Sequence, residues 1–491
     1  MTANPSAVWV GPARVRPSRL AAEFYRQEYT DLEDQLDRSG HRLVVLGKLG
    51  RLFTGPFGSK LPASLYDTPN GVPLLRVQNI GNIFLNETDI ARIPLEVHED
   101  IHRSKLEPGD LALAKAGRLG ALSKIPAHIQ ECNITQHIVG VKVRVDKVRG
   151  SYLAAFFLSR FGSFQLKRQG IGTLIKYLGI EETRAAKVAV PDRRIQDYIG
   201  AKVELAERCQ AVATQCESKS SDLLRDGLGQ STDDILKTLP ADGLLPTGAF
   251  ASMVDAELLR NRLDPSGYHP TLIALQAWAS TKRNRFTPLR DLVTAETSKR
   301  SRVGKNCSFF VSVLHLNDRG FLDEDGARAY RPESGGREAR SMDVLVSCIN
   351  PAANRIGVCD FGSEGGGCSP EFSILRARNG VDPNYVAFAL RTDLCRTQLL
   401  HLGRGTSSSR RRVDESELLD VLVPTVECAS AIAKTVRRGH VLSAASIRLI
   451  NEAKADVEAL IDGTLDVQAI LAGTLKPPTA DDIPELAEDD A

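Results

Sequence analysis

The sequence lacks the features that place a protein in a membrane or direct it out of the cell. No run of about 18 consecutive apolar residues, the length that crosses a bilayer, occurs in its 491 residues. The first 20 residues contain prolines and arginines where a signal peptide needs an apolar segment. We therefore expect a soluble, cytoplasmic protein without a membrane partner.

Paired cysteines are also missing. The nine cysteines include no Cys-x-x-Cys pair, the spacing typical of zinc sites, and their positions do not match between the two halves of the chain. Disulfide frameworks belong mainly to small secreted proteins. We expect reduced, mostly buried thiols, with neither a zinc cluster nor a disulfide framework.

The net charge of +2 hides an uneven distribution of charge. Six acidic residues lie between Asp481 and Asp490, and we predict that this tail is disordered. Without them the net charge rises from +2 to +8. Short cationic clusters carry much of the excess: Arg193-Arg194, Lys299-Arg300 with Arg302, and Arg410-Arg411-Arg412. Clustered cations favour a polyanion as partner, and solvated surface charge is the alternative.

An internal duplication is the most informative feature, because residues 19–228 and 262–461 follow one pattern. Identical residues recur at an offset of 243 and then at an offset of 233. Examples are Tyr25 and Tyr268, Asp110 and Asp343, Tyr152 and Tyr385, Gln165 and Gln398, and Val190-Pro191 and Val423-Pro424. The repeat is far longer than the roughly 20–50 residues of a solenoid unit, so each copy is a domain. Two copies predict two similar binding faces with pseudo-two-fold symmetry, which suits a partner with two half-sites.

Both copies predict the same order of elements. A short helix near 19–38 or 271–280 precedes a body of short strands, β-branched runs and Gly/Pro turns. A long amphipathic helix, 195–224 or 426–461, then closes the copy. We predict an α+β fold with two strand-rich domains separated by two long antiparallel helices. The alternative is that each helix packs on its own domain.

The predicted boundaries follow the repeat. They are an N-terminal segment with a short helix (1–42), a first strand-rich domain (43–194), a first long helix (195–228), a linker (229–261), a second strand-rich domain with a leading helix (262–424), a second long helix (425–463) and an acidic, disordered tail (464–491).

Several motifs of the first copy resemble the target-recognition domains of type I restriction-modification specificity subunits. The run Gly71-Val-Pro-Leu-Leu-Arg-Val-Gln-Asn-Ile80 is similar to a strand of that family, and Gly55-Pro-Phe-Gly-Ser59 to its upstream loop. Leu106-Glu-Pro-Gly-Asp110 resembles its L-x-x-G-D stretch. The order domain, helix, domain, helix is more specific than any single motif. The second copy departs from the pattern, with Met342 in place of Gly109 and no clear counterpart of the 74–79 strand.

The resemblance implies a subunit that reads a split sequence of double-stranded DNA, one half with each domain. The helices would set the spacing and dock two methyltransferase subunits, and restriction or translocase subunits would join a larger assembly. The chemistry would belong to those partners, since the chain has neither the [DNS]-P-P-[YFW] methyltransferase motif nor the G-x-x-x-x-G-K-[ST] phosphate loop. We predict a non-catalytic DNA-binding subunit with no catalytic residue, metal or cofactor.

Base recognition needs polar side chains on loops, while phosphate contacts set position. In the first copy the candidate DNA-binding residues are Ser59, Lys60, Arg76, Gln78, Asn79, Lys115, Arg118, Gln136, His137, Thr173 and Lys176. For Arg76 the alternative is a structural ion pair. In the second copy the glycines, hydroxyls and arginines of 403–412 suit a phosphate backbone, and a solvated surface loop is the alternative. The candidates there are Arg404, Thr406, Ser407, Ser408, Arg410, Arg411 and Arg412, with Lys299, Arg300, Arg302 and Arg355 in addition.

Two other functions stay open at this point. The chain could be a duplicated scaffold that joins protein partners and contacts DNA only nonspecifically. A remote alternative is a zinc hydrolase, because His98-Glu99-Asp100-Ile101-His102 spells the HExxH motif, in which two histidines of one helix hold zinc. The sequence shows no evident third ligand.

Overall fold

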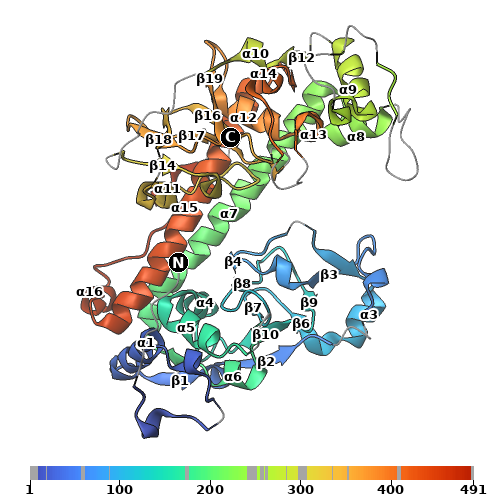
Figure 1. Ribbon diagram of the computed structural model, residues 1–491. Helices are drawn as coiled ribbons and strands as arrows, with labels where there is room; N and C mark the ends of the chain where they lie inside the picture. Colours follow the sequence, from blue (N-terminus) through green and yellow to red (C-terminus); the bar gives the residue numbers. More distant parts are fainter. Residues whose placement is uncertain are drawn as a thin grey trace. The chain divides into compact units, whose positions relative to one another are not determined.

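The computed structural model describes the chain apart from residues 1–8, 18, 57–60, 88, 172–175, 240–250, 255–258, 260–263, 283–284, 297–306, 334, 351–352, 406–410 and 488–491 (Figure 1). It divides into two units. Unit 1 is Met1–Cys209 with Ala445–Ala491, and unit 2 is Gln210–Ala444. Each unit therefore holds one strand-rich body and a part of each of two long helices.

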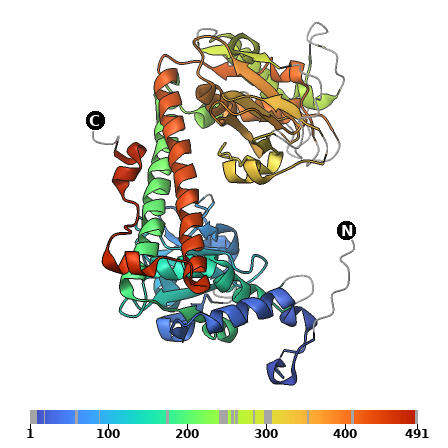
Figure 2. The same cartoon turned by 90° about the vertical axis from the view of Figure 1, so that its left-hand side faces the viewer.

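The two long helices are α7 (Arg193–Leu228) and α15 (Ala429–Asp462). In unit 1, Lys202 Nζ donates to Asp456 Oδ2 at 2.6 Å. In unit 2, Cys428 Sγ lies 3.4 Å from the Leu223 carbonyl oxygen. A residue late in one helix thus meets a residue early in the other, and both views show the helices side by side (Figures 1 and 2). The prediction of an α+β fold with two paired antiparallel helices is confirmed.

The body of unit 1 contains two larger sheets and a two-stranded sheet, in which β1 (Leu43–Val45) pairs with β11 (Lys187–Ala189). The first sheet has the order β2 (Gly50–Thr54), β10 (Ile138–Val143), β7 (Leu111–Ala114), β8 (Leu122–Lys124) and β4 (Asn82–Ile83). The second has the order β5 (Ala91–Ile93), β3 (Val72–Leu75), β9 (Cys132–Ile134) and β6 (Lys105–Leu106). Helices α1 (Gln27–Arg38), α4 (Gly150–Leu158) and α5 (Arg160–Arg168) belong to the same body.

The body of unit 2 repeats this topology. β12 (Phe286–Pro288) pairs with β20 (Leu422–Pro424), as β1 does with β11. One sheet has the order β13 (Val293–Ala295), β19 (Phe372–Ala377), β16 (Asp343–Ser347) and β17 (Ile356–Cys359). The other has the order β14 (Phe310–Val311), β18 (Gly366–Cys368) and β15 (Arg337–Ala339). Helices α9 (Pro270–Ser280), α12 (Pro383–Arg391) and α13 (Asp393–Leu402) correspond to α1, α4 and α5.

Buried strands explain why these segments form sheets. Every residue of β7 and of β16 is buried, as expected for a central strand covered on both faces. β10 and β19 begin with four buried residues and end half-buried. The cores of both bodies therefore lie around equivalent central strands.

Side chains repeat as well as strands. The buried hydroxyl of Tyr152 donates to the Ala189 carbonyl at 2.6 Å, and that of Tyr385 donates to the Pro424 carbonyl at 2.7 Å. These carbonyls belong to β11 and β20, the strands before the long helices. In addition, the amides of Gln165 and Gln398 each exchange two hydrogen bonds with the backbone of one residue, Lys187 in β11 and Leu422 in β20.

Met342 has the backbone conformation of its counterpart Gly109 although it is not a glycine. Its φ is 66°, and that of its counterpart Gly109 is 87°, so both positions are left-handed. Each is followed by an aspartate, Asp343 or Asp110, whose carboxylate accepts from a backbone N–H three residues earlier at 2.9 Å. Glycine takes this conformation at least cost, which explains Gly109 but leaves Met342 in a strained position.

The C-terminal tail and the linker are more ordered than predicted. Helix α16 (Val467–Ala472) lies in the segment predicted to be disordered, and Ile470 and Ile483 are buried. Helix α8 (Thr232–Thr238) lies in the predicted linker. The prediction of disorder was wrong for the described part of the tail. It was based on the acidic residues, whereas apolar residues such as Ile470 and Ile483 are buried. Asp466 and Ser231 cap these helices in the same way, accepting from a backbone N–H three residues later.

The cysteines are free thiols. Burial raises the pKa of Cys132 and of Cys395 to about 12, so both are neutral at pH 7. Among the described residues, no helix combines the length and the apolarity needed to cross a membrane.

Candidate nucleic-acid interface

In unit 1 the predicted DNA-binding segments meet at one end of the two sheets. Thr135 N–H, after β9, donates to the Leu75 carbonyl at the end of β3 (3.1 Å). Lys115 N–H, after β7, donates to the His137 carbonyl (2.8 Å), and Leu178 N–H donates to the Lys115 carbonyl (2.8 Å). We call this set edge 1: residues 76–79, 115–118, 135–137 and 176–178. Backbone hydrogen bonds thus join four segments that are far apart in the sequence.

The loop after β2 reaches the same place. A Cβ atom on Gly55 would lie 1.8 Å from the Ile134 carbonyl oxygen, so the two backbones touch there and only glycine fits. Residues 57–60, which include the candidates Ser59 and Lys60, lie outside the described residues. Their chain neighbours place the start of this loop beside β9.

Arg76 and Gln78 share one acidic partner. Arg76 Nη2 donates to the Asp89 carbonyl at 2.6 Å and to its carboxylate at 3.0 Å, and Gln78 Nε2 donates to the same carboxylate at 3.0 Å. The guanidinium also lies 5.9 Å from the centre of the Tyr66 ring. Arg76 therefore takes the structural ion pair that the sequence left open, whereas Gln78 is exposed at the tip of its turn.

Asn79 is a correction to the predicted site. It is fully buried, its Oδ1 accepts from Arg76 N–H at 2.9 Å, and its Nδ2 donates to the Asn86 carbonyl at 3.0 Å. These bonds hold the 3-10 turn η5 (Val77–Asn79), so β3 ends at Leu75 and the following residues are not a strand as predicted. Because both ends of its amide are occupied inside the body, Asn79 does not reach a DNA base.

The other candidates of edge 1 lie near its surface. Arg118 is exposed and donates to the Ile80 carbonyl at 3.0 Å, and Lys176 pairs with Glu23 at 2.7 Å. Gln136 Nε2 lies 3.2 Å from His137 Nε2. Lys115 is half-buried, and its ammonium forms no ion pair within the described part of the chain. The edge thus presents amides, an imidazole and cations together.

Unit 2 contains the same edge, hydrogen bond by hydrogen bond. Ser369 N–H donates to the Val311 carbonyl (2.8 Å), Cys348 N–H to the Glu371 carbonyl (2.8 Å) and Val413 N–H to the Cys348 carbonyl (3.2 Å). These are the counterparts of the three bonds that define edge 1. We call the equivalent set edge 2: residues 312–315, 348–350, 369–371 and 411–413.

A reciprocal pair of backbone bonds closes each edge. Ile171 and Tyr177 exchange bonds of 2.9 and 2.7 Å in unit 1, and Arg404 and Arg412 exchange bonds of 2.7 and 2.8 Å in unit 2. Between them lie residues 172–175 and 406–410, which are outside the described residues. The candidates Thr173, Thr406, Ser407, Ser408 and Arg410 fall there, and Lys299, Arg300 and Arg302 fall in the undescribed segment 297–306.

Sequence reasoning missed one segment of edge 2. After β14, Ser312 N–H donates to His315 Nδ1 at 3.0 Å and forms the turn η9 (Val313–His315). This is the turn η5 again, with Ser312, Leu314 and His315 in the positions of Arg76, Gln78 and Asn79. The shared Val77 and Val313 are the only identity within the turn, and the offset there is 236 instead of 243 or 233. The turn η9 is therefore not aligned with η5 at either of the offsets that define the repeat.

Arg412 of edge 2 and the adjacent Arg404 are paired with carboxylates. Arg404 contacts Glu417 at 2.8 Å and Asp414 at 3.3 Å, and Arg412 contacts Glu371 at 2.9 Å. Arg411 is half-buried, and the Arg355 carbonyl accepts from Ser347 N–H at 3.1 Å in the β16–β17 connection. These ion pairs offset the charge of Arg404 and Arg412 in and beside edge 2.

The HExxH segment does not have the geometry of a zinc site. Helix α3 (Leu95–Asp100) ends before His102, so the two histidines do not share one helical face. His98 is buried against the Asn133 side chain, and His102 Nδ1 lies 2.8 Å from the Glu99 carbonyl oxygen. Within the described residues, no three His, Cys, Asp or Glu side chains form a group that could hold a metal ion.

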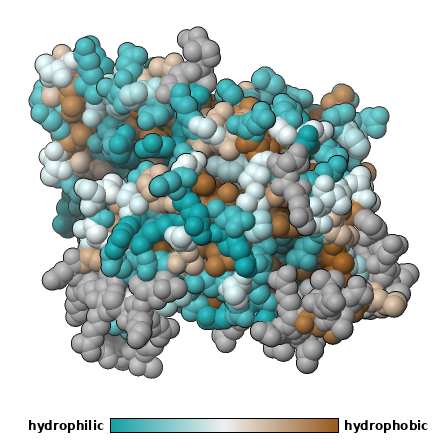
Figure 3. All heavy atoms as spheres, turned by 90° about the horizontal axis from the view of Figure 1, so that it is seen from above, coloured by the Kyte–Doolittle hydropathy of each residue, from teal (hydrophilic) through white to brown (hydrophobic). Residues whose placement is uncertain are grey.

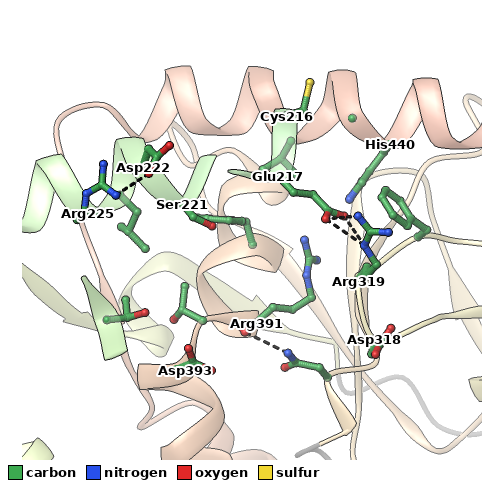
Figure 4. Close-up of a pocket in the computed structure, with 18 of the residues that line it drawn as sticks. Cys216, Glu217, Ser221, Asp222, Arg225, Asp318, Arg319, Arg391, Asp393 and His440 are labelled. Atoms are coloured by element: carbon green, nitrogen blue, oxygen red, sulfur yellow. Dashed lines mark hydrogen bonds and ion pairs between the residues drawn. The ribbon is translucent and has the colours of Figure 1, made fainter. Parts of the chain in front are cut away.

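A separate pocket of about 350 Å³ lies within unit 2, between parts of α7, α15 and α12 (Figure 4). Glu217 accepts two hydrogen bonds from Arg319 Nε at 2.8 and 3.0 Å, and Arg391 Nη1 donates to the Ile356 carbonyl at 2.9 Å. Burial, together with the charge of Arg391, lowers the pKa of His440 to about 3. Charged side chains such as Glu217, Arg319 and Arg391 line the pocket, and no residue of edge 2 does.

Comparison with known proteins found similar chains among solved structures. No protein-family model matches the sequence, and no curated protein matches it. Among solved structures, the chain is similar to the type I restriction-modification S subunit from M. genitalium, with a TM-score of 0.39 and 10% identity over 90% of this chain and 98% of that chain. The HsdS subunit from Thermoanaerobacter tengcongensis has a TM-score of 0.28 and 16% identity, over 87% of this chain and 97% of that one. A third structure, described by the complex assembly and conformational transition of a type I system, has a TM-score of 0.26 and 14% identity, over 87% of this chain and 97% of that chain.

Proposed function

We propose that this chain is a non-catalytic specificity subunit that binds a bipartite DNA target and directs methyltransferase subunits, and in a larger assembly restriction subunits, to it. Edge 1 would contact one half of the target and edge 2 the other. The observation that carries the proposal is the repetition of one hydrogen-bonded edge in both bodies, down to the individual backbone bonds of Lys115 and Cys348.

The architecture of the edges suits base recognition. Each is built from segments that follow buried strands, so a rigid core fixes where the side chains are presented. Amide and imidazole groups such as Gln78, Gln136 and His137 can donate to or accept from base edges. Lys115 and Arg118 supply the positive charge that phosphate contacts need.

The long helices would hold the two half-site readers and dock the methyltransferase subunits. This part of the proposal rests on the sequence resemblance and on the presence of two antiparallel helices shared by both units. On the face drawn in Figure 3, polar side chains alternate with small apolar areas, as on most protein surfaces. A surface of this kind is compatible with DNA and with subunits that assemble reversibly.

A domain exchange tests the proposal. Residues 43–194 are replaced by the equivalent domain of another specificity subunit, and genome-wide adenine methylation is mapped in cells that contain the methyltransferase. We expect one half of the methylated motif to change and the other to stay. If both halves change, or neither, the modular assignment of the two edges is wrong.

Competition separates a specificity subunit from a scaffold that binds DNA nonspecifically. At physiological salt, a sequence-specific protein prefers its site over random duplex by about 10³-fold or more. A scaffold would bind both alike, and equal competition by random duplex would therefore favour the scaffold.

A further inference from the structure

We infer that Leu314 recognises the 5-methyl group of a thymine in the half-site bound by unit 2. The inference rests on the proposed function and names a specificity-determining residue that sequence motifs do not reveal. It starts from the equivalence of the turns η5 and η9.

The two turns occupy the same place in the fold. Each follows the strand that runs parallel to the central strand of its sheet, β3 beside β9 and β14 beside β18. In each, the N–H of the first turn residue donates to a side chain three positions later, Arg76 to Asn79 and Ser312 to His315. Leu314 therefore stands where Gln78 stands in unit 1.

The Leu314 side chain is far more exposed to solvent than the apolar side chains near it in the sequence. Its relative exposure is 85%, whereas Val311 is fully buried and Leu316 is 3% exposed. The turn is fixed from both sides, because Ser312 Oγ accepts from Leu314 N–H at 3.3 Å and the His315 ring lies edge-on to Tyr330 at 5.4 Å. A rigid turn that holds one large aliphatic side chain in water is unfavourable for the free protein, and contact with an apolar group would remove that cost.

Two positions of edge 2 have lost a polar side chain relative to edge 1. Cys348 takes the place of Lys115, and Pro370 that of Gln136. The cations Arg404 and Arg412 are engaged with carboxylates.

Apolar contact is the mode of direct readout that an aliphatic side chain on this turn offers. In the major groove, the only apolar group that distinguishes one base from the others is the methyl group of thymine. An aliphatic side chain at a fixed position suits that group. We therefore assign Leu314 to a thymine methyl, in contrast to Gln78, whose amide suits hydrogen bonding to a base edge.

The test begins with selection of duplexes from a randomised library by the full-length chain. The half-site bound by unit 2, identified by the domain exchange described above, is expected to contain a thymine on one strand. Replacement of that thymine by uracil removes only the methyl group and should weaken binding by the wild-type chain about fourfold.

Variants of Leu314 complete the test. Leu314→Ala should bind the thymine and uracil duplexes equally, and Leu314→Gln should change the selected base at that position while the other half-site stays the same. Leu95→Ala is the matched control, because Leu95 is 57% exposed at the start of α3. α3 follows β5, which is antiparallel to β3 and so ends at the opposite end of the sheet from edge 1. We expect this variant to keep the wild-type difference between thymine and uracil.

Three outcomes would overturn the inference. The unit 2 half-site could contain no thymine, or every uracil duplex could bind as the thymine duplex does. Leu314→Ala could also weaken binding to both duplexes by the same factor, so that the difference between thymine and uracil persists, and abolish DNA bending. That result would make Leu314 a wedge between base steps. Failure to select any motif at all would instead refute the proposed function, so the two failures are distinguishable.

Discussion

A few side chains make the same hydrogen bonds in both copies of the duplication, although the two copies share few residues. Tyr152 and Tyr385 donate to equivalent carbonyls, and Gln165 and Gln398 bind equivalent strands. A buried hydroxyl or amide without a partner costs free energy, so such a residue is difficult to replace once its acceptor is part of the backbone. Surface positions carry no such penalty, which explains why Lys115 and Cys348 differ while their backbone bonds agree.

Removal of either tyrosine hydroxyl should destabilise the unit that contains it. Tyr152→Phe and Tyr385→Phe each leave a buried carbonyl without its donor, and we expect each to lower the free energy of unfolding by about 1–2 kcal/mol. Urea denaturation of the full chain measures the loss. Tyr66→Phe is the control, because that hydroxyl is only half-buried and its bond to the Leu61 carbonyl is 3.2 Å long. Losses no larger than in the control would show that the two hydroxyl bonds contribute little.

The half-buried His440 of the unit 2 pocket makes stability depend on pH. His440 is neutral in the folded protein because its pKa is lowered to about 3, whereas in the unfolded chain it has an ordinary pKa near 6.5. Below that ordinary pKa the unfolded state binds a proton that the folded state does not. The stability of the protein should therefore fall as pH drops from 7.5 to 5.5, by at most about 1.4 kcal/mol per pH unit for this group.

His440→Gln should flatten that dependence in thermal unfolding measured across the same pH range. His128→Gln is the control, since His128 is 56% exposed beside Glu87. A pH slope that His440→Gln leaves unchanged would contradict the assignment.

At the scale of elements, the turn η5 gives two adjacent residues different roles, one at the surface and one in the core. Gln78 is exposed at the tip, and Asn79 is buried beneath it. The identity of these residues does not reveal which of them faces solvent, because the answer depends on the side-chain bond that ends β3 and starts the turn.

Alanine at each position should give opposite results. Asn79→Ala removes two buried hydrogen bonds, one from the Arg76 N–H and one to the Asn86 carbonyl, so we expect a loss of about 1–3 kcal/mol in stability. Gln78→Ala should leave stability unchanged and reduce the preference for target over random duplex. Calorimetry and competition binding measure the two effects. A stable Asn79→Ala variant that loses specificity would reverse the assignment.

The sequence predicts the elements better than the surface they form. Periodicity reveals the long helices, and the repeat offset reveals the recurrence of Tyr152 and Asp110. These two residues are buried, so the core sets their spacing. The turn η9 is not visible, since insertions change the offset and Ser312 and Leu314 share no chemistry with Arg76 and Gln78. The order of the tail is likewise missed, because Ile470 and Ile483 are isolated apolar residues that gain meaning only when they pack.

At the scale of the whole molecule, electrostatics should dominate the affinity for DNA of any sequence. Each phosphate contact made by Lys or Arg adds about 0.9 to the slope of log affinity against log salt concentration. Lys115→Ala with Arg118→Ala should therefore reduce the slope by nearly 2 and weaken binding to target and random duplexes alike.

Titration of both duplexes over a series of salt concentrations measures this. The control is Arg412→Ala, which removes a cation already paired with Glu371 and should change the slope less. An unchanged slope in the double variant would remove Lys115 and Arg118 from the interface.

Unit 1 is assembled from two separate stretches, Met1–Cys209 and Ala445–Ala491, while unit 2 is one continuous stretch between them. During synthesis on a ribosome, the segment that completes unit 1 is made after unit 2. Unit 2 can close as soon as residue 444 has emerged, whereas the N-terminal body gains its part of α15 only later. A prematurely terminated product would therefore carry one finished reader and one lacking that helix.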